Sequence, residues 1–232
     1  MLVVKDFTII CGHYGCGKTN LAINMAVQAR DAGKKTTLVD MDIVNPYFRA
    51  SDYPEVLEHR GIELIAPTYA RTTIDLPMIP AAVQSIFSGD KVVIIDAGGD
   101  DAGSAVLGSL ADKIKSMDYD MLYVVNRYRP LSSTVNQAKV LLEEIQKATG
   151  LKATGIISNG HLMGDTRVET VLDAVPFAEA MSRETGLPLI GCAVQTALAH
   201  DVEEAMALKG YPYPCYSVEI YVRTPWTDTG VR

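Results

Sequence analysis

The chain has 232 residues, of which 48% are hydrophobic and 21% are charged, as in ordinary globular proteins and unlike disordered or fibrous ones. Its formal net charge of -7 disfavours binding to nucleic acid, because that binding relies on clustered lysine and arginine. The sequence has no run of about 20 apolar residues and no basic leader before an apolar stretch, so we expect neither export nor a stable membrane anchor. The four cysteines form no C-x-x-C pair, which favours reduced thiols in a cytoplasmic protein.

Short apolar runs rich in β-branched residues alternate with helical stretches along the chain. Seven of these runs are predicted to be strands: residues 7–11, 36–39, 62–65, 92–95, 121–125, 154–157 and 188–191. Such runs suit a sheet that is buried on both faces, and their alternation with helices makes the sheet mainly parallel. The sequence therefore predicts a doubly wound α/β fold with about seven strands flanked by helices. We expect residues 1–232 to form one domain, with a further strand possible at 216–223.

The first predicted helix ends at Gly33, a residue type that often terminates helices. Apolar residues between positions 21 and 29 form one face of this helix, and Asn20, Asn24 and Gln28 form the other. The helix is therefore amphipathic.

Two more helices are indicated by apolar residues at helical spacing. One has Ser132 or Ser133 as its expected cap and Gly150 as its terminator. The other follows Asp165, and Pro176 is expected to break or kink it, because proline removes a backbone donor and clashes with the preceding turn.

Residues 12–19 read GHYGCGKT and satisfy the pattern G-x-x-x-x-G-K-[ST], directly after an apolar strand and before an amphipathic helix. In this context the glycines let successive backbone N–H groups turn toward phosphate oxygens, and the helix adds its positive dipole end. Lys18 is expected to reach the β- and γ-phosphates, and the Thr19 hydroxyl to hold Mg²⁺. The predicted nucleotide-contacting residues of this segment are Gly12, His13, Tyr14, Gly15, Cys16, Gly17, Lys18, Thr19 and Asn20.

Asp96 ends the apolar run 92–95, which is the pattern of a strand whose aspartate supports Mg²⁺ directly or through water. Ligands of a doubly wound sheet bind outside the carboxyl ends of the strands, so an acid at this position is a candidate for the site. Gly99 follows in D-x-x-G, where its backbone N–H is placed to bond a γ-phosphate. The alternative reading of Asp96 is a helix cap or turn residue.

Asp40 and Asp42 follow another apolar run and fall on the same side if the strand continues, by its period of two. One of them is expected to orient the Mg²⁺ shell and the other the attacking water. Solvated loop acids are the alternative, because aspartate is common in turns. Residues 45–49, NPYFR, combine a restricted turn with apolar side chains and a cation, and are a candidate switch segment.

These segments resemble the MinD/ParA-type ATPases, the P-loop group that also includes nitrogenase iron protein, arsenite-pump ATPases, metal-insertion ATPases, CobQ/CobB and dethiobiotin synthetase. The resemblance runs from Phe7 to about Val194 and is carried by five segments: GHYGCGKT at 12–19, VDMD at 39–42, VIIDAGG at 93–99, IISN at 156–159 and LPLIG at 187–191. Within the group the chain is most similar to bacterial ATP-binding proteins with a GHYG-x-GKT loop and a DIVNPYFR segment.

The resemblance implies a role for each matching residue. Lys18 and Asp42 are the implied catalytic residues, Lys18 on the phosphates and Asp42 on the water. The implied Mg²⁺ residues are Thr19, Asp96 and Asp42, the γ-phosphate sensor is Gly99, and the base-recognising amide is Asn159. Guanine-specific N-K-x-D loops need an aspartate where this chain has Leu162, so ATP is the expected nucleotide.

The loop departs from the resemblance at His13. MinD-type loops read G-K-G-G-x-G-K-[ST], and their early lysine crosses a dimer interface to the phosphates of the partner. Histidine is mostly uncharged at neutral pH and shorter than lysine, so it is a poor substitute for a fixed cation. Arg49, Arg127 and Arg129 are candidates for the missing charge. Each of them is otherwise a partner-facing or solvated side chain.

The first functional hypothesis is a nucleotide-driven switch: ATP binding and hydrolysis change the loops, and a partner protein or a second copy of the chain reads the change. A metalloenzyme under assembly or activation is a candidate target. The alternative is an ATP-dependent small-molecule enzyme of the dethiobiotin synthetase, CobQ or kinase kind, with residues 69–80 as a candidate pocket lining. A positioning protein on membrane or nucleoid is disfavoured, because residues 216–223 alternate like a strand instead of forming a basic amphipathic helix.

Overall fold

The computed structural model of the chain describes residues 5–41, 50, 53–66, 81–98 and 101–222. Each of the predicted strands is present, and a further strand lies near the C-terminus. The strands are β1 Phe7–Gly12, β2 Thr36–Met41, β3 Glu63–Ile65, β4 Val92–Ala97, β5 Tyr119–Val125, β6 Gly155–Ser158, β7 Leu189–Gln195 and β8 Cys215–Val218. They form one eight-stranded sheet in the order β3-β2-β4-β1-β5-β6-β7-β8, and every pairing in it is parallel.

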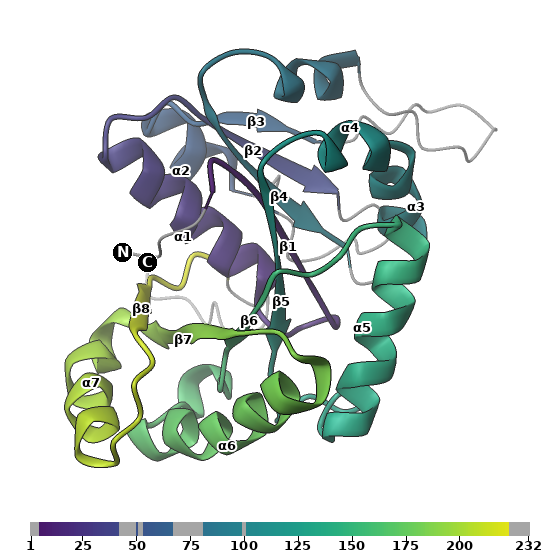
Figure 1. Cartoon of the computed structure of the whole chain (residues 1–232). Coiled ribbons are helices and arrows are strands. Elements are labelled where there is room, and N and C mark those ends of the chain that lie inside the picture. The colour runs from purple at the N-terminus through teal and green to yellow at the C-terminus, as the bar shows by residue number, and fades with distance from the viewer. Residues whose placement is uncertain (1–4, 42–49, 51–52, 67–80, 99–100, 223–232) are drawn as a thin grey trace.

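Helices cover both faces of this sheet (Figure 1). The α-helices are α1 Lys18–Asp31, α2 Pro54–His59, α3 Asp101–Ser109, α4 Ala111–Lys115, α5 Val135–Thr149, α6 Val168–Thr185 and α7 Ala199–Leu208. Short 3-10 turns lie at η2 Ala81–Phe87, η3 Met163–Asp165 and η4 Thr196–Leu198. None of the helices within the described ranges combines the length and the apolar character needed to cross a bilayer.

Two apolar cores lie on opposite faces because neighbouring residues of a strand point in opposite directions. Ile10 of β1 belongs to the core shared with α1 and α2, whereas Ile9 belongs to the core shared with α3, α4 and α5. Strands buried on both faces explain the continuous apolar runs of the sequence, and the doubly wound α/β prediction is confirmed.

The caps of α5 and the course of α6 differ from the sequence-based expectation. Thr134, not Ser132 or Ser133, caps α5: its Oγ1 accepts from the Gln137 backbone N–H at 3.3 Å, and Gln137 Oε1 accepts from the Thr134 N–H at 3.2 Å. This reciprocal pair is a capping box, which an isolated serine hydroxyl does not match.

Helix α6 runs through Pro176 without ending there, so of the two predicted outcomes, a break or a kink, the break is wrong. A proline inside a helix costs about 3 kcal/mol. Val175 and Ala178 on either side of it are completely buried, and burial of apolar side chains at about 1.5–3 kcal/mol each for the larger ones offsets that cost.

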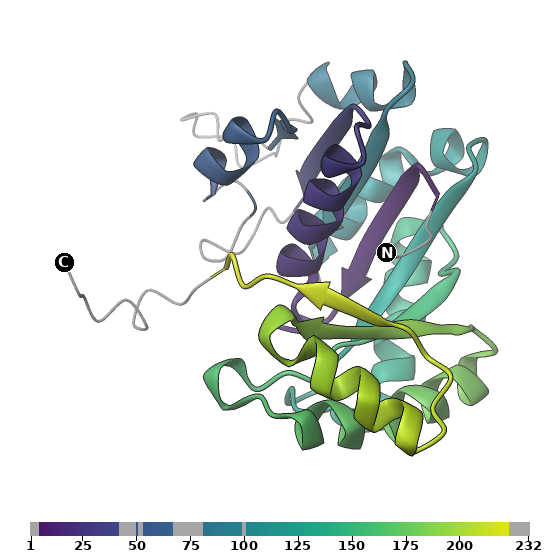
Figure 2. The same cartoon turned by 90° about the vertical axis from the view of Figure 1, so that its left-hand side faces the viewer.

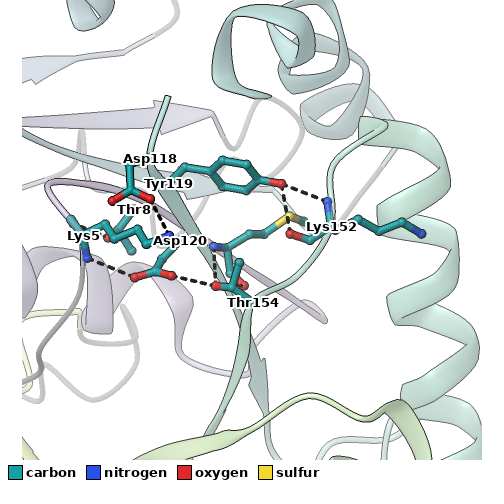
Figure 3. Close-up of polar contacts among 8 residues, drawn as sticks. Lys5, Thr8, Asp118, Tyr119, Asp120, Lys152 and Thr154 are labelled. Atoms are coloured by element: carbon teal, nitrogen blue, oxygen red, sulfur yellow. Dashed lines mark hydrogen bonds and ion pairs between the residues drawn. The ribbon is translucent and has the colours of Figure 1, made fainter. Parts of the chain in front are cut away.

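A polar network holds the strands together at the edge where β1 and β5 begin (Figure 3). Lys5 Nζ lies 2.7 Å from Asp118 Oδ1, and the Lys5 backbone N–H donates to Asp120 Oδ2 at 3.0 Å. Thr154 donates its hydroxyl to Asp120 Oδ1 at 2.9 Å and accepts from the Met121 N–H at 3.0 Å. These contacts lie at the opposite end of the strands from residues 12–19, so their role is to fix the register of β1, β5 and β6.

The C-terminal segment, residues 219–222, lies along α1 (Figure 2) and is bound by amide side chains of that helix. Asn24 makes a paired contact with the backbone of Glu219, donating to its carbonyl and accepting from its N–H, each at 2.8 Å. Asn20 Nδ2 also donates to the Glu219 carbonyl at 2.8 Å, and its Oδ1 accepts from the Tyr221 N–H at 2.9 Å. The helix therefore bonds this segment in the way a neighbouring strand would.

Candidate functional site

The loop at residues 12–19 joins the central strand β1 to the first turn of α1. Two of its glycines are required by their surroundings. Gly12 has φ +148°, and a Cβ there would lie 2.5 Å from the Val124 carbonyl oxygen. Gly17, which precedes α1, has φ +96°, and a Cβ there would lie 2.2 Å from Asn159 Nδ2. Side chains are therefore excluded at both positions, and the backbone of the loop packs tightly on β5 and on the residue after β6.

Lys18 reaches back across the loop from the first turn of α1. Its Nζ donates to the His13 carbonyl at 3.3 Å, and only 5% of the residue is exposed. The Cys16 backbone N–H closes the turn by donating to the same carbonyl at 3.2 Å. A buried ammonium at a helix N-terminus suits an anionic ligand, because the helix dipole and the lysine add their positive potentials there.

Two buried carboxylates lie on the face of the sheet that α1 covers. Asp40 of β2 and Asp96 of β4 are register partners, and the residues are only 2% and 1% exposed. Because Ile10 is the partner of Asp96 on β1 and faces α1, both carboxylates point to the α1 face. Aspartate oxygens at this place fit a hard cation such as Mg²⁺. Asp96 is the last residue but one of β4, close to the strand end that the sequence predicted, and its role as a Mg²⁺ residue stays a prediction.

The charges of Lys18 and Asp96 both act on the pKa of Cys16, a residue of the loop. Burial raises the pKa of the Cys16 thiol, Lys18 lowers it, and Asp96 raises it. Burial also raises the pKa of the Cys11 thiol, to about 12. Both cysteines are therefore protonated at neutral pH and act as apolar packing under the loop.

Asn159 follows β6 and is almost completely buried against the loop. Its Nδ2 donates to the Cys16 carbonyl at 2.7 Å, and its backbone N–H donates to the Val125 carbonyl at 2.8 Å. The side-chain amide of Asn159 therefore donates a hydrogen bond that holds the loop in place. Recognition of a base by this residue stays a prediction.

The turn after β6 is held by groups from two neighbouring strands. Asn126, directly after β5, donates from Nδ2 to the His161 carbonyl at 3.0 Å, and Gln195, at the end of β7, donates to the Met163 carbonyl at 3.2 Å. His161 Nδ1 accepts from the Met163 N–H at 3.1 Å. Burial lowers the pKa of His161, and Arg129 lowers it further, so the imidazole is neutral at pH 7.

Asn126 and Gln195 are additions to the predicted set. Their signal in the sequence is modest: each is a polar residue placed where an apolar strand ends. The side chain of Asn20 bonds the C-terminal segment, and a nucleotide contact of this residue stays a prediction. His13 Nδ1 lies 2.9 Å from the Tyr14 carbonyl, and Thr19 is half-buried in the first turn of α1.

The predicted residues outside the described ranges are Asp42, Arg49 and Gly99, together with the segment 69–80.

A loop of this sequence between a buried parallel strand and a helix, with an inward lysine and strand-end aspartates, defines the P-loop nucleoside triphosphatase fold. The sequence pattern of one family, the CobQ/CobB/MinD/ParA nucleotide binding domain, matches residues 7–163. The chain belongs to this family and carries a nucleotide-binding domain of the MinD/ParA type.

Solved structures with the same fold include the cell division protein FtsY from Thermotoga maritima, at 22% identity and a TM-score of 0.52 over 84% of this chain and 64% of that one. FtsY from Mycoplasma mycoides is similar at 16% identity and a TM-score of 0.55, over 84% of this chain and 62% of that one. The signal recognition particle 54 kDa protein from Aeropyrum pernix, in complex with GDP, is similar at 20% identity and a TM-score of 0.51, over 80% of this chain and 41% of that one. The chain spans less than two thirds of each of these proteins, and the likeness shows a shared fold. A search of curated proteins finds no match.

Proposed function

We propose that this protein is a Mg²⁺-dependent ATPase of the cytoplasm that works as a nucleotide-driven switch on a partner protein. The observation that carries the proposal is the position of the buried Lys18. Its side chain crosses the loop, and its Nζ donates to the His13 carbonyl at 3.3 Å. An ammonium in that position is ready to bind the β- and γ-phosphates. Thr19 and Asp96 are the proposed Mg²⁺ residues, supported by the place of Thr19 next to Lys18 in α1 and of Asp96 on the face of the sheet that α1 covers. Asp42 is the proposed residue that positions the attacking water, and this role rests on the sequence resemblance.

ATP is the proposed nucleotide, since Leu162 stands where a guanine-specific loop needs a carboxylate. The GDP in the Aeropyrum pernix structure makes a guanine nucleotide the competing ligand. We expect saturating Mg-ATP to raise the melting temperature by roughly 5–10 °C, since a ligand at a hundred times its Kd adds about 2.7 kcal/mol. Mg-GTP at the same concentration is expected to give a clearly smaller shift. Differential scanning fluorimetry measures both, and an equal or larger shift with GTP would remove the adenine assignment.

Apolar side chains exposed around the loop support a protein partner. Tyr14 is 47% exposed in the loop itself, Leu131 is 72% exposed after β5, and Leu162 and Met163 are 40% and 41% exposed after β6. All four follow the carboxyl ends of neighbouring strands, the edge at which a nucleotide would bind. Exposed apolar side chains in the connections at this edge of the sheet favour a docking site for a partner. A metalloenzyme under assembly or activation is the proposed target class, following the family.

The switch is tested by asking which proteins bind in each nucleotide state. Immobilised protein loaded with Mg-ATP and with Mg-ADP is exposed to the same cell extract, and bound proteins are identified by mass spectrometry. We expect at least one partner enriched more than about tenfold in one state, corresponding to a coupling of about 1.4 kcal/mol, within the usual range for allosteric coupling. The Lys18→Ala variant, treated in the same way, should show no difference between the states. Equal capture in both states, combined with strong stimulation of turnover by a small metabolite, would instead favour the small-molecule enzyme.

A further inference from the structure

Arg129 lies against the phosphate-binding loop. A Cβ built on Gly15 would lie 3.4 Å from both the Cζ and the Nε of this arginine, so the planar guanidinium lies beside the space that a side chain at Gly15 would take. Arg129 also lowers the pKa of Cys16 and of His161 through its charge, which places it between the loop and the turn after β6. The loop thus has two cations beside it: Lys18 from α1 and Arg129 from the turn after β5.

The guanidinium is not satisfied by the residues around it. Its Nε is buried and has no hydrogen-bond partner in the described part of the chain, and Arg129 forms no ion pair there. Arginine stays charged and has five donors, so burying one of them without an acceptor is costly. In the same turn the Ser132 hydroxyl is also buried without a partner among the described residues. Orphaned donors beside a phosphate-binding loop indicate an anionic ligand that supplies acceptors.

The turn that carries Arg129 is fixed by its own hydrogen bonds. The Arg129 N–H donates to the Asn126 carbonyl at 3.1 Å, Asn126 Oδ1 accepts from the Tyr128 N–H at 3.1 Å, and the Ser132 N–H donates to the Arg129 carbonyl at 3.3 Å. Leu131 has φ +68°, a conformation that costs a non-glycine residue roughly 1–3 kcal/mol. The arginine is therefore held beside the loop in advance of ligand binding.

Arg127, two residues earlier, is turned elsewhere and is a natural control. Its Nη1 donates to the Asp173 carbonyl of α6 at 2.5 Å, and its guanidinium lies 5.6 Å from the centre of the Tyr128 ring. The residue is exposed. Both arginines follow β5, but Arg129 lies beside Gly15 of the loop, whereas Arg127 bonds α6.

We propose that Arg129 is a phosphate-binding residue of the nucleotide site, contributed by the same chain, which bonds the phosphate chain of a nucleoside di- or triphosphate from the Gly15 side of the loop. It supplies, from within the same chain, the fixed cation that His13 does not. The inference rests on the proposed function, because it takes the loop to be a nucleotide site. The planar fork of arginine suits phosphate oxygens better than the point charge of lysine.

The test compares Arg129→Gln with Arg127→Gln in the full chain by isothermal titration with Mg-ATP, Mg-ADP and adenosine. We expect Arg129→Gln to weaken ATP and ADP binding by about tenfold or more, as for loss of a charge-assisted hydrogen bond, and to leave adenosine binding unchanged. Arg127→Gln should stay within about twofold of the unaltered protein, as expected for a surface charge. Thermal unfolding without nucleotide reports whether each variant is folded.

The outcomes separate the two proposals. Failure of the unaltered protein to bind nucleotide would refute the proposed function. Tight binding by the unaltered protein with equal affinity in Arg129→Gln would refute the role of Arg129 and leave the function standing. Equal loss of ATP and adenosine binding would show a structural role and also overturn the proposal. If Arg129→Gln does not fold, Arg129→Lys replaces it: a loss of ATP affinity of about threefold or more supports the fork geometry, and unchanged affinity contradicts it.

Discussion

Replacing Lys18 with alanine is expected to weaken Mg-ATP binding by roughly 10- to 150-fold, which corresponds to about 1.5–3 kcal/mol for a charge-assisted hydrogen bond. The lysine is only 5% exposed and is held across the loop by the His13 carbonyl, so its ammonium needs little rearrangement to meet the phosphates. Hydrolysis should fall at least as much, because the same charge stabilises the transferring phosphoryl group. Isothermal titration and phosphate release measure the two effects.

Lys34 is the matched control for this variant. It follows the far end of α1, is about half exposed, and forms a surface ion pair with Asp6 at 2.6 Å. Its replacement by alanine should leave nucleotide affinity within about twofold, since surface ion pairs contribute about 0–1 kcal/mol. If Lys18→Ala binds and hydrolyses ATP as the unaltered protein does, the site assignment is wrong.

Gly17→Ala is expected to lower the free energy of unfolding by about 2–6 kcal/mol and to abolish nucleotide binding. The positive φ of +96° strains any residue with a Cβ, at about 1–3 kcal/mol. The added methyl group also lies 2.2 Å from Asn159 Nδ2, so the asparagine must leave its bond to the Cys16 carbonyl. Loss of that buried bond adds about 1–3 kcal/mol. Urea unfolding and titration with Mg-ATP measure the two losses.

The Gly33→Ala variant is a control that has the backbone strain of a positive φ without a steric clash of the new methyl group. Gly33 follows α1 with φ +81°, but a Cβ there meets no atom within 4 Å. Its substitution should cost only the backbone strain, about 1 kcal/mol, and leave nucleotide binding intact. In a double-mutant cycle, Asn159→Ala should relieve part of the Gly17→Ala penalty, because it removes the group that collides. Additive effects in that cycle would exclude the proposed collision.

The sheet was predictable because its signals are local. A strand buried on both faces must be apolar throughout, and the run 92–95 ending in Asp96 shows both the strand and its carboxyl end within five residues. The loop at 12–19 is likewise encoded in consecutive residues. The break expected at Pro176 does not occur, because the local cost of the proline is outweighed by the burial of neighbouring side chains. That burial depends on contacts with distant elements, which the sequence does not show.

The contacts that the sequence did not predict join site residues that are distant along the chain. Asn159 reaches Cys16 across 143 positions, and Arg129 meets Gly15 only because β5 lies next to β1 in the sheet. Sequence alone offered Arg127 and Arg129 as equivalents, two residues apart in the same turn. Their separation into a loop-facing and an α6-facing side chain comes from the hydrogen bonds of that turn.

The contact between α1 and the C-terminal segment provides a place for a spectroscopic reporter. Glu219 is bound through its backbone N–H and carbonyl, and its own side chain is exposed, so a dye on a cysteine at this position preserves the contact. Asn20, which also bonds Glu219, is the residue directly after Thr19. We therefore expect a movement of the first helical turn on phosphate binding to change the environment of the label. Fluorescence from this position would follow the nucleotide cycle in real time without touching the binding loop.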